Sequence, residues 1–275
     1  MEVMKVNGVN LGQGVCNLPV PAYVLEQAAA AAAEGINRYT NPRGLVSLRH
    51  AVANKLALFN KLEADPETEI LITCGATGAF EAVCASLLNP GDEVVILEPS
   101  YPYHVTALKR YQAKINFVTL SAPNWDVDWD AVKAAITPKT KFILINTPGN
   151  PTGKIFTREE LETLAGILDG TNCMVVTDEI YEYMTFDGAS HLSPATVPGL
   201  AGRTITIGGY SKTFSITGWR IGYMVAPKEL AVHLTSVLDA IYVCPPAPLQ
   251  EAVARSINHF GENFYHELNA KYEAK

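Results

Sequence analysis

The segment GGYSKTFSITGWR, residues 208–220, places one lysine among small and hydroxyl-bearing residues between two apolar runs. Both runs, residues 204–207 and 221–226, have the length and composition of buried strands. Lys212 lies in the turn between these predicted strands, and Arg220 follows eight positions later. A lysine amine forms Schiff bases with carbonyl compounds, and an arginine binds phosphate in a forked geometry. Lys212 and Arg220 together could hold a phosphorylated aldehyde, the lysine through the aldehyde carbon and the arginine through the phosphate. The alternative is a surface lysine in a polar loop, because Ser-Lys-Thr alone is also common in such loops.

Apolar runs alternate with helical patterns over the rest of the chain, and Thr157 with Glu160 forms a capping box before one predicted helix. Continuous apolar strands between helices predict an α/β protein with a mostly parallel sheet covered on both faces. The predicted strands are residues 70–73, 93–97, 114–120, 141–146, 174–177, 204–207 and 221–226. The predicted helices are residues 21–33, 45–61, 79–88, 103–111, 130–136, 159–168, 228–241 and 248–275.

Polar motifs follow four more of these strands, at the carboxyl ends where ligands bind in such sheets. GATG, residues 75–78, offers backbone amides at a helix start to an anion, or is only a tight turn. EPSYPY, residues 98–103, offers aromatic faces for stacking, although such tyrosines also serve as core residues. NTPGNPTG, residues 146–153, contains an asparagine that a turn alone would explain. Asp178 ends a buried strand, where a carboxylate needs a partner unless it caps a helix or lies at the surface.

Composition narrows the classes of function. A net charge of −7 argues against a nucleic-acid-binding protein, which normally presents a basic face. No apolar run is long enough to cross a membrane, and the first residues lack a signal-peptide pattern. The five cysteines are scattered without Cys-x-x-Cys spacing, so neither a metal site nor a disulfide framework is predicted. A reducing, cytoplasmic location fits this pattern. The six histidines are dispersed and are interpreted as structural or solvated.

Together the five motifs resemble those of class I/II aminotransferases, the pyridoxal-phosphate enzymes of the aspartate aminotransferase type (fold type I). The most specific of them is SKTFSITGWRIG, residues 211–222, and the resemblance extends over nearly the whole chain. It implies a three-layer α/β/α large domain that binds pyridoxal 5'-phosphate. The implied reaction moves an amino group from an L-amino acid to a 2-oxo acid. Two alternatives stay open: a lyase or synthase of the same fold, or a cofactor-binding scaffold or sensor with little turnover.

The resemblance also implies a role for each matching residue. Lys212 would hold the cofactor as an internal aldimine and then act as the catalytic base. Asp178 would pair with the pyridine nitrogen, and Tyr181 and Asn150 would bind the phenolic oxygen. Tyr101 would stack on the ring.

Further implied contacts concern the phosphate, the substrate and a second subunit. The phosphate would bind the amides of Ala76 and Thr77 together with Ser211 and Arg220. The amide of Gly14, in a segment predicted to be extended over residues 10–15, would meet the substrate carboxylate. Tyr39 would reach the cofactor phosphate of a neighbouring subunit, so the resemblance implies a homodimer.

The resemblance divides the chain into three parts. Residues 1–40 would contribute to a small domain and to the active-site entrance, and residues 41–245 would form the cofactor-binding large domain. Residues 246–275 would begin an interdomain helix and a truncated small domain, without the arginine that clamps the substrate carboxylate in relatives. On this view, Leu249, Val253, Ile257 and Phe260 would lose their packing partners and become exposed.

Overall fold

The computed structural model describes residue 14 and residues 16–275; most of the predicted extended segment, residues 10–13 and 15, lies outside the described residues. Seven strands form one sheet in the order β1-β7-β6-β5-β4-β2-β3. Among the described residues, β7 runs opposite to the other six strands, which are mutually parallel, and this confirms the mostly parallel sheet. The strands are β1 (Ile70–Cys74), β2 (Glu93–Glu98), β3 (Lys114–Thr119), β4 (Thr140–Asn146), β5 (Met174–Asp178), β6 (Thr204–Gly209) and β7 (Ile221–Val225).

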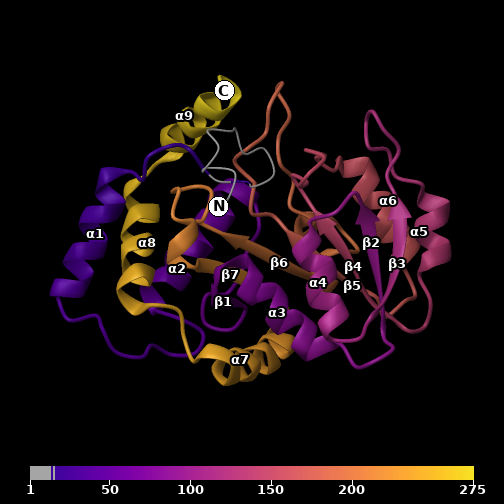
Figure 1. Ribbon diagram of the computed structural model, residues 1–275, viewed down its shortest axis with the longest axis horizontal. Coiled ribbons are helices and arrows are strands. Elements are labelled where there is room, and N and C mark those ends of the chain that lie inside the picture. The colour runs from indigo at the N-terminus through magenta and orange to yellow at the C-terminus, as the bar shows by residue number, and fades with distance from the viewer. Residues whose placement is uncertain (1–13, 15) are drawn as a thin grey trace, which may run out of the picture.

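Helices cover both faces of the sheet, as continuous apolar strands require. Figure 1 places α1 and α8 beyond one end of the sheet and α5 beside β3 at the other. No helix in the described part of the chain is both long enough and apolar enough to cross a membrane. The α-helices are α1 (Ala22–Ala33), α2 (Val46–Lys55), α3 (Gly75–Leu87), α4 (Pro102–Arg110), α5 (Trp129–Ala135), α6 (Arg158–Leu168), α7 (Lys228–Tyr242), α8 (Ala247–His259) and α9 (Glu262–Glu273).

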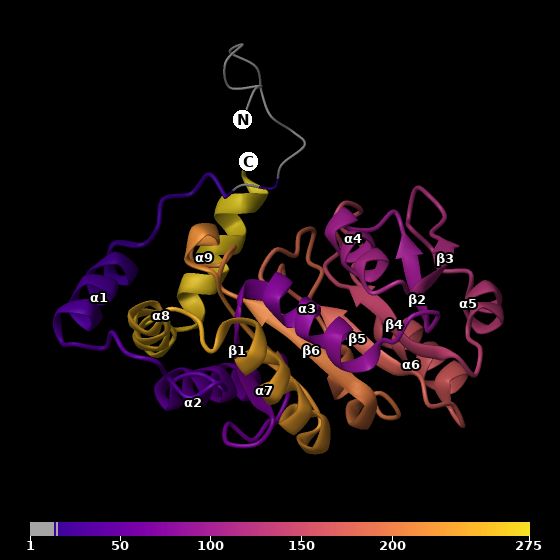
Figure 2. The same cartoon turned by 60° about the horizontal axis from the view of Figure 1, so that its bottom comes forward.

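The alternation of side chains along each strand divides the core into separate apolar clusters. Leu71 of β1 packs with α3 and α7 on one face, where α3 and α7 cross the sheet side by side (Figure 2). Its neighbours Ile70 and Ile72 pack on the opposite face with side chains of α2 and α8. A third cluster lies between α5, α6 and the β2–β5 part of the sheet. This arrangement confirms the predicted three-layer α/β/α fold.

Strand direction brings all the predicted motifs to one edge of the sheet. Strands β1, β2, β4, β5 and β6 are mutually parallel, so the segments that follow them emerge at the same edge. Because β7 is antiparallel to β6, its amino end lies at this edge too, and Arg220 immediately precedes it. The chain therefore needs only the short turn of residues 210–220 to present both Lys212 and Arg220 at one place.

Two helix boundaries differ from the sequence prediction. Helix α3 begins at Gly75 rather than at residue 79, so the GATG motif is the first turn of the helix itself. The helix predicted over residues 45–61 is α2 followed by a π-helical turn, Leu56–Asn60. The capping box of Thr157 and Glu160 is present as predicted at the start of α6.

The C-terminal region corrects a larger expectation. Residues 248–275 were predicted as one helix, but the chain breaks at Phe260 and Gly261 into α8 and α9. Helix α8 lies against α1 and α2, so its apolar face is covered. Val253 and Ile257 are 0% and 7% exposed, and Leu249 and Phe260 are partly buried against the same cluster. The expected exposure of these four residues was therefore wrong, because α1 and α2 supply the packing partners.

Candidate active site

Lys212 lies in the turn between β6 and β7 and is partly exposed. Its ammonium donates a hydrogen bond to the carbonyl oxygen of Gly14, and Nζ lies 5.7 Å from the ring centroid of Tyr181. A Cβ atom built on Gly14 would lie 3.6 Å from the Tyr181 hydroxyl and 3.8 Å from Lys212 Nζ. Three residues that are far apart in the sequence therefore meet at one point. The glycine leaves space beside the amine that a side chain would narrow.

Tyr181 adjoins a second predicted residue. The side-chain amide of Asn150 donates to the Tyr181 hydroxyl at 3.5 Å. Asn146, at the end of β4, fixes the backbone of Asn150 by accepting from its amide at 2.7 Å. Burial, followed by the nearby charge of Asp178, raises the pKa of Tyr181 to about 12. The phenol is therefore neutral near pH 7, so it can donate a proton in a hydrogen bond.

Asp178 ends β5 and is 6% exposed. One carboxylate oxygen lies 3.1 Å from Nε2 of His104, and the other accepts from the backbone amide of Ile180 at 3.2 Å. The partner that a buried carboxylate requires is therefore His104. Sequence analysis missed this histidine by grouping it with the dispersed ones. The available signal was its place in the first turn of α4, three residues after Tyr101.

Tyr101 immediately precedes α4 and is half-buried. Its ring meets the His104 ring edge-on, with centroids 5.3 Å apart, and stacks on Tyr103 at 5.1 Å. Through His104, the aromatic side chain and the Asp178 carboxylate belong to one contact network. Burial raises the pKa of Tyr101, so this ring also stays neutral near pH 7.

An anion site is built where the start of α3 meets Arg220. The first amides of α3 have no side-chain cap, and the helix dipole adds partial positive charge there. Arg220 adopts a left-handed conformation, with φ of 58° and ψ of 48°, and its guanidinium lies against Gly75. A Cβ atom on Gly75 would come within 2.5 Å of that guanidinium. Glycine at this position is therefore what lets the arginine approach the helix start.

The remaining predicted residues are placed as follows. Ala76 and Thr77 lie in the first turn of α3, and Ser211 is buried directly before Lys212. In the described part of the chain, the hydrogen bonds of the Lys212 and Arg220 side chains all go to backbone carbonyls. Both cations thus keep their charge available for a ligand.

Tyr39 is 85% exposed in the loop between α1 and α2, and no hydrogen bond or aromatic contact among the described residues joins it to this cluster.

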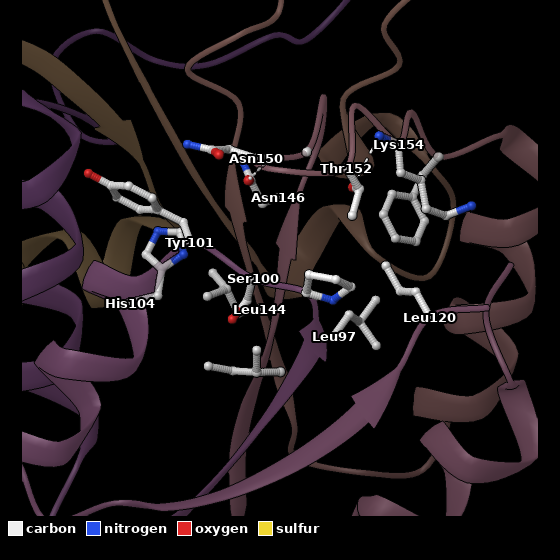
Figure 3. Close-up of a pocket in the computed structure, with 14 residues that line it drawn as sticks. Leu97, Ser100, Tyr101, His104, Leu120, Leu144, Asn146, Asn150, Thr152 and Lys154 are labelled. Carbon is white, nitrogen blue, oxygen red and sulfur yellow. Dashed lines mark hydrogen bonds between the residues drawn. The ribbon is translucent and has the colours of Figure 1, made fainter. Parts of the chain in front are cut away.

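A small cavity adjoins the cluster between the carboxyl ends of β2 and β4. Figure 3 shows Tyr101 and His104 on one side of it, Thr152 and Lys154 on the other, and leucine side chains along its floor. Its volume of about 30 Å³ accommodates one or two water molecules. The cavity is therefore too small for an amino acid, and the groups around Lys212 define the candidate site.

The family is shown by comparison with known proteins. The model of the family described as aminotransferase class I and II matches residues 6–275. The chain is a class I and II aminotransferase family member. Enzymes of this family depend on pyridoxal phosphate. The donor set fits that cofactor: a lysine amine, a buried carboxylate, an aromatic face and an uncapped helix start beside an arginine.

Several aminotransferases are similar to this family member in sequence. The kynurenine–oxoglutarate transaminase of Dictyostelium discoideum is 34% identical over 291 residues, covering 99% of this chain and 67% of that protein. A probable N-succinyldiaminopimelate aminotransferase of Mycobacterium tuberculosis is 38% identical over 256 residues, covering 92% of this chain and 64% of that protein. The chain thus spans about two thirds of the length of these relatives.

Solved structures agree with the fold of this family member. The Mycobacterium tuberculosis N-succinyldiaminopimelate aminotransferase superposes with a TM-score of 0.95 at 36% identity, covering 99% of this chain and 71% of that one. An Escherichia coli protein with a methionine aminotransferase function gives 0.94 at 29% identity, with coverages of 99% and 72%. The likeness therefore extends over almost the entire chain described here and confirms fold type I.

Proposed function

We propose that this chain catalyses pyridoxal-phosphate-dependent transfer of an amino group from an L-amino acid to a 2-oxo acid, with Lys212 as the covalent attachment point. One observation carries the proposal: the Lys212 amine meets the Tyr181 phenol and the Gly14 carbonyl at the sheet edge where Asp178 and Arg220 also lie. Family membership and the names of similar proteins support the same class of reaction.

Lys212 and Asp178 would perform the proton chemistry. When bound, pyridoxal phosphate supplies an aldehyde that links to amines and a ring that accepts electrons from the substrate α-carbon. The Lys212 amine, once released by an incoming substrate amine, would act as the base that takes the proton from that α-carbon. Asp178 would hold a proton on the pyridine nitrogen. The His104 contact supports this role because it orients the carboxylate.

Tyr181, Asn150 and Tyr101 would orient the ring. The Tyr181 hydroxyl and the Asn150 amide are both donors, and they lie 3.5 Å apart, so they can converge on one phenolic oxygen. Tyr101 would supply the stacking face, and its packing on His104 ties that face to the Asp178 side of the site. Stacked and hydrogen-bonded neighbours would also exclude water from the reacting atoms.

The start of α3 would hold the phosphate. The amides of Ala76 and Thr77, the Ser211 hydroxyl and the Arg220 guanidinium are the proposed donors, because a helix amino terminus beside an arginine favours a dianion. The Gly14 amide would meet the substrate carboxylate. Its location beside Nζ and Tyr181 supports that assignment.

A homodimer is part of the proposal. Tyr39 is exposed and lies next to Thr40, whose amide contacts Cys244 Sγ at 3.4 Å. This contact places the loop at Cys244, just after the end of α7, where Ile241 and Val243 are 46% and 37% exposed. The resulting apolar surface supports an interface through which Tyr39 would reach the phosphate site of a second copy.

The proposal also includes the domain division that the family resemblance implies, into residues 1–40, 41–245 and 246–275. A cytoplasmic location is proposed too, and the five free thiols support it.

An absorbance titration tests the function. Purified protein is mixed with pyridoxal phosphate and then with a panel of amino acids, beside Lys212→Ala and the exposed-lysine control Lys228→Ala. A bound-cofactor band that Lys212→Ala alone removes, and that an amino acid converts to the amine form of the cofactor, is expected. A band that no amino acid alters would favour a binding scaffold. Conversion to products other than an oxo acid would favour a lyase or synthase, and no band with folded protein would refute the assignment of Lys212.

A further inference from the structure

A buried ion pair lies behind the candidate site. Lys55, the last residue of α2, is 5% exposed, and Glu182, in the turn after β5, is 3% exposed. Their charged atoms are 2.5 Å apart. A buried charge is costly unless its remaining donors or acceptors are satisfied, so the surroundings of this pair determine whether it can persist.

Those surroundings satisfy both charges. The Lys55 ammonium also donates to Asn60 Oδ1 at 2.9 Å and to the Tyr223 hydroxyl at 3.1 Å, and Asn60 donates to the second Glu182 oxygen at 2.8 Å. The π-helical turn makes this possible, because i→i+5 hydrogen bonding brings residues five apart onto one side of the helix. The rings of Phe59, Tyr183 and Tyr223 lie 5.4–5.7 Å from Nζ. Lys55, Glu182, Asn60 and Tyr223 are therefore all buried, and each is hydrogen-bonded within the network.

Glu182, which supplies the carboxylate of this network, directly follows Tyr181 in the sequence. The turn containing both residues is tight: the Glu182 amide donates to the Glu179 carbonyl at 3.0 Å, and the Met184 amide donates to the Tyr181 carbonyl at 2.7 Å. The two side chains diverge, with Glu182 anchored to α2 and the Tyr181 phenol beside Asn150 and Gly14. Fixing Glu182 thus fixes the backbone from which the phenol extends.

The same network also contacts the strand that leads to Lys212. Tyr223 of β7 pairs with Gly208 of β6. A Cβ atom on Gly208 would lie 2.4 Å from the Tyr223 hydroxyl, so the tyrosine that accepts from Lys55 crosses directly over this glycine. One buried lysine is therefore connected both to the Tyr181 turn and to β6, the strand that ends three residues before Lys212.

We propose that the Lys55–Glu182 ion pair is a positioning device that sets the Tyr181 phenol relative to the Lys212 amine. The proposal rests on the proposed function, because it gives the phenol a task at the bound cofactor. Lys55 and Glu182 make no hydrogen bond to the side chains of Tyr181 or Lys212 in the described structure, so they would act on the phenol through the Tyr181 turn and β6. Replacing Lys55 or Glu182 should therefore change the protonation of the bound cofactor, because that protonation depends on the Tyr181 hydrogen bond.

The test is the pH midpoint at which the absorbance of the protein-bound cofactor changes. It is measured for the unmodified protein, Glu182→Gln, Tyr181→Phe and the combined variant. Glu182→Gln is expected to move the midpoint in the same direction as Tyr181→Phe does. The combined variant is expected to have the same midpoint as Tyr181→Phe alone. If Glu182→Gln does not fold, Lys55→Met combined with Glu182→Leu replaces the ion pair by apolar side chains, which proteins often tolerate. That variant is expected to shift the midpoint too.

A control separates positioning from general destabilisation. Arg203→Met removes donors to the carbonyls of Leu168, Thr171 and Cys173, before the amino end of β6, and should lower thermal stability without moving the midpoint. An unchanged midpoint in Glu182→Gln would overturn the positioning role. The same would follow if Glu182→Gln shifted the midpoint of Tyr181→Phe as much as it shifts the midpoint of the unmodified protein. Absence of any cofactor band in the unmodified protein would instead overturn the proposed function.

Discussion

The Nε2 atom of His104 lies 3.1 Å from Oδ2 of Asp178, and the two side chains are 6% and 9% exposed. Their sequence separation of 74 residues is closed by the parallel arrangement of β2, β4 and β5, which brings the start of α4 beside the end of β5. His104 also packs on Phe80 and Tyr101 with ring centroids 4.7 and 5.3 Å away. It therefore combines a polar contact to the carboxylate with an apolar contact to the ring that would stack on the cofactor.

Replacing His104 separates these two contacts. His104→Phe keeps an aromatic ring against Phe80 and Tyr101 but removes the hydrogen-bonding nitrogen. A hydrogen bond to a charged group contributes about 1.5–3 kcal/mol, so cofactor affinity should fall about 10- to 100-fold. Equilibrium binding of pyridoxal phosphate measures this, with His233→Phe on the exposed side of α7 as the control. Equal affinity in both variants would show that Asp178 does not need His104.

Gly222 controls the position of the proposed phosphate site. A Cβ atom there would lie 2.7 Å from the carbonyl carbon of Gly75 and 2.9 Å from the amide nitrogen of Ala76, both backbone atoms. Gly222→Ala must therefore displace the first turn of α3. Affinity for pyridoxal phosphate should fall by about 10-fold or more, since two or more charge-assisted hydrogen bonds are disturbed.

The matched comparison uses pyridoxal, which lacks the phosphate. Gly222→Ala should weaken binding of pyridoxal much less than binding of pyridoxal phosphate. Gly218→Ala, which has no heavy atom within 4 Å of its added Cβ, should change neither affinity. A Gly222→Ala variant that lost both ligands equally would place the phosphate elsewhere.

The sequence predicted most of the sheet and the residues that share its carboxyl edge. The buried strands are short continuous apolar runs, and their length together with the glycine and proline turns that flank them distinguishes them from helices. For that reason the turn holding Lys212 and the residues around Asp178 were placed correctly at one edge. The roles of those residues stay predictions, because family resemblance rather than strand periodicity assigned them.

The features that sequence analysis missed depend on long-range packing. His104, Lys55 and Glu182 lie in ordinary helical or turn segments, and only the folded chain brings each to its partner. The break at Gly261 was missed because the apolar spacing of α8 continues into α9. Neither local propensity nor motif spacing specifies which distant carboxylate a buried lysine or histidine will meet.

Glu93 gives a pH-dependent prediction at the opposite edge of the sheet. Its carboxylate accepts from Lys114 at 3.0 Å and from Asn116 and Thr137 at 2.9 Å each. These donors, Lys114 first, lower the pKa of Glu93 from 4.5 to about 2. Because the folded pKa is lower than the unfolded one, the stabilisation is present above about pH 4.5 and is lost as pH falls toward 2.

Urea unfolding of the unmodified protein and Glu93→Gln checks this sign. The variant should be less stable at about pH 7, and the difference in unfolding free energy should shrink at about pH 3, where the unfolded carboxyl is protonated. Glu162→Gln is the control, because Glu162 is an exposed residue of α6 whose only ion pair is a long one in the described structure, 3.9 Å from Arg158. A difference that grows on acidification would contradict the donor arrangement around Glu93.

Phe214 links the turn of Lys212 to the C-terminal helices. It is completely buried two residues after Lys212, and its ring lies 5.6 Å from Phe260 and 5.8 Å from Phe264. Because the chain breaks at Phe260 and Gly261, Phe260 contacts Phe214 from the end of α8 and Phe264 contacts it from α9. Phe214→Ala should lower the unfolding free energy by about 3–5 kcal/mol, because a large cavity would open among rings that are fixed by both helices. Phe186→Ala removes the same atoms from a side chain that is 40% exposed, so it should cost much less. Urea unfolding of both variants provides the measurement, and equal losses would mean that α8 and α9 do not depend on Phe214.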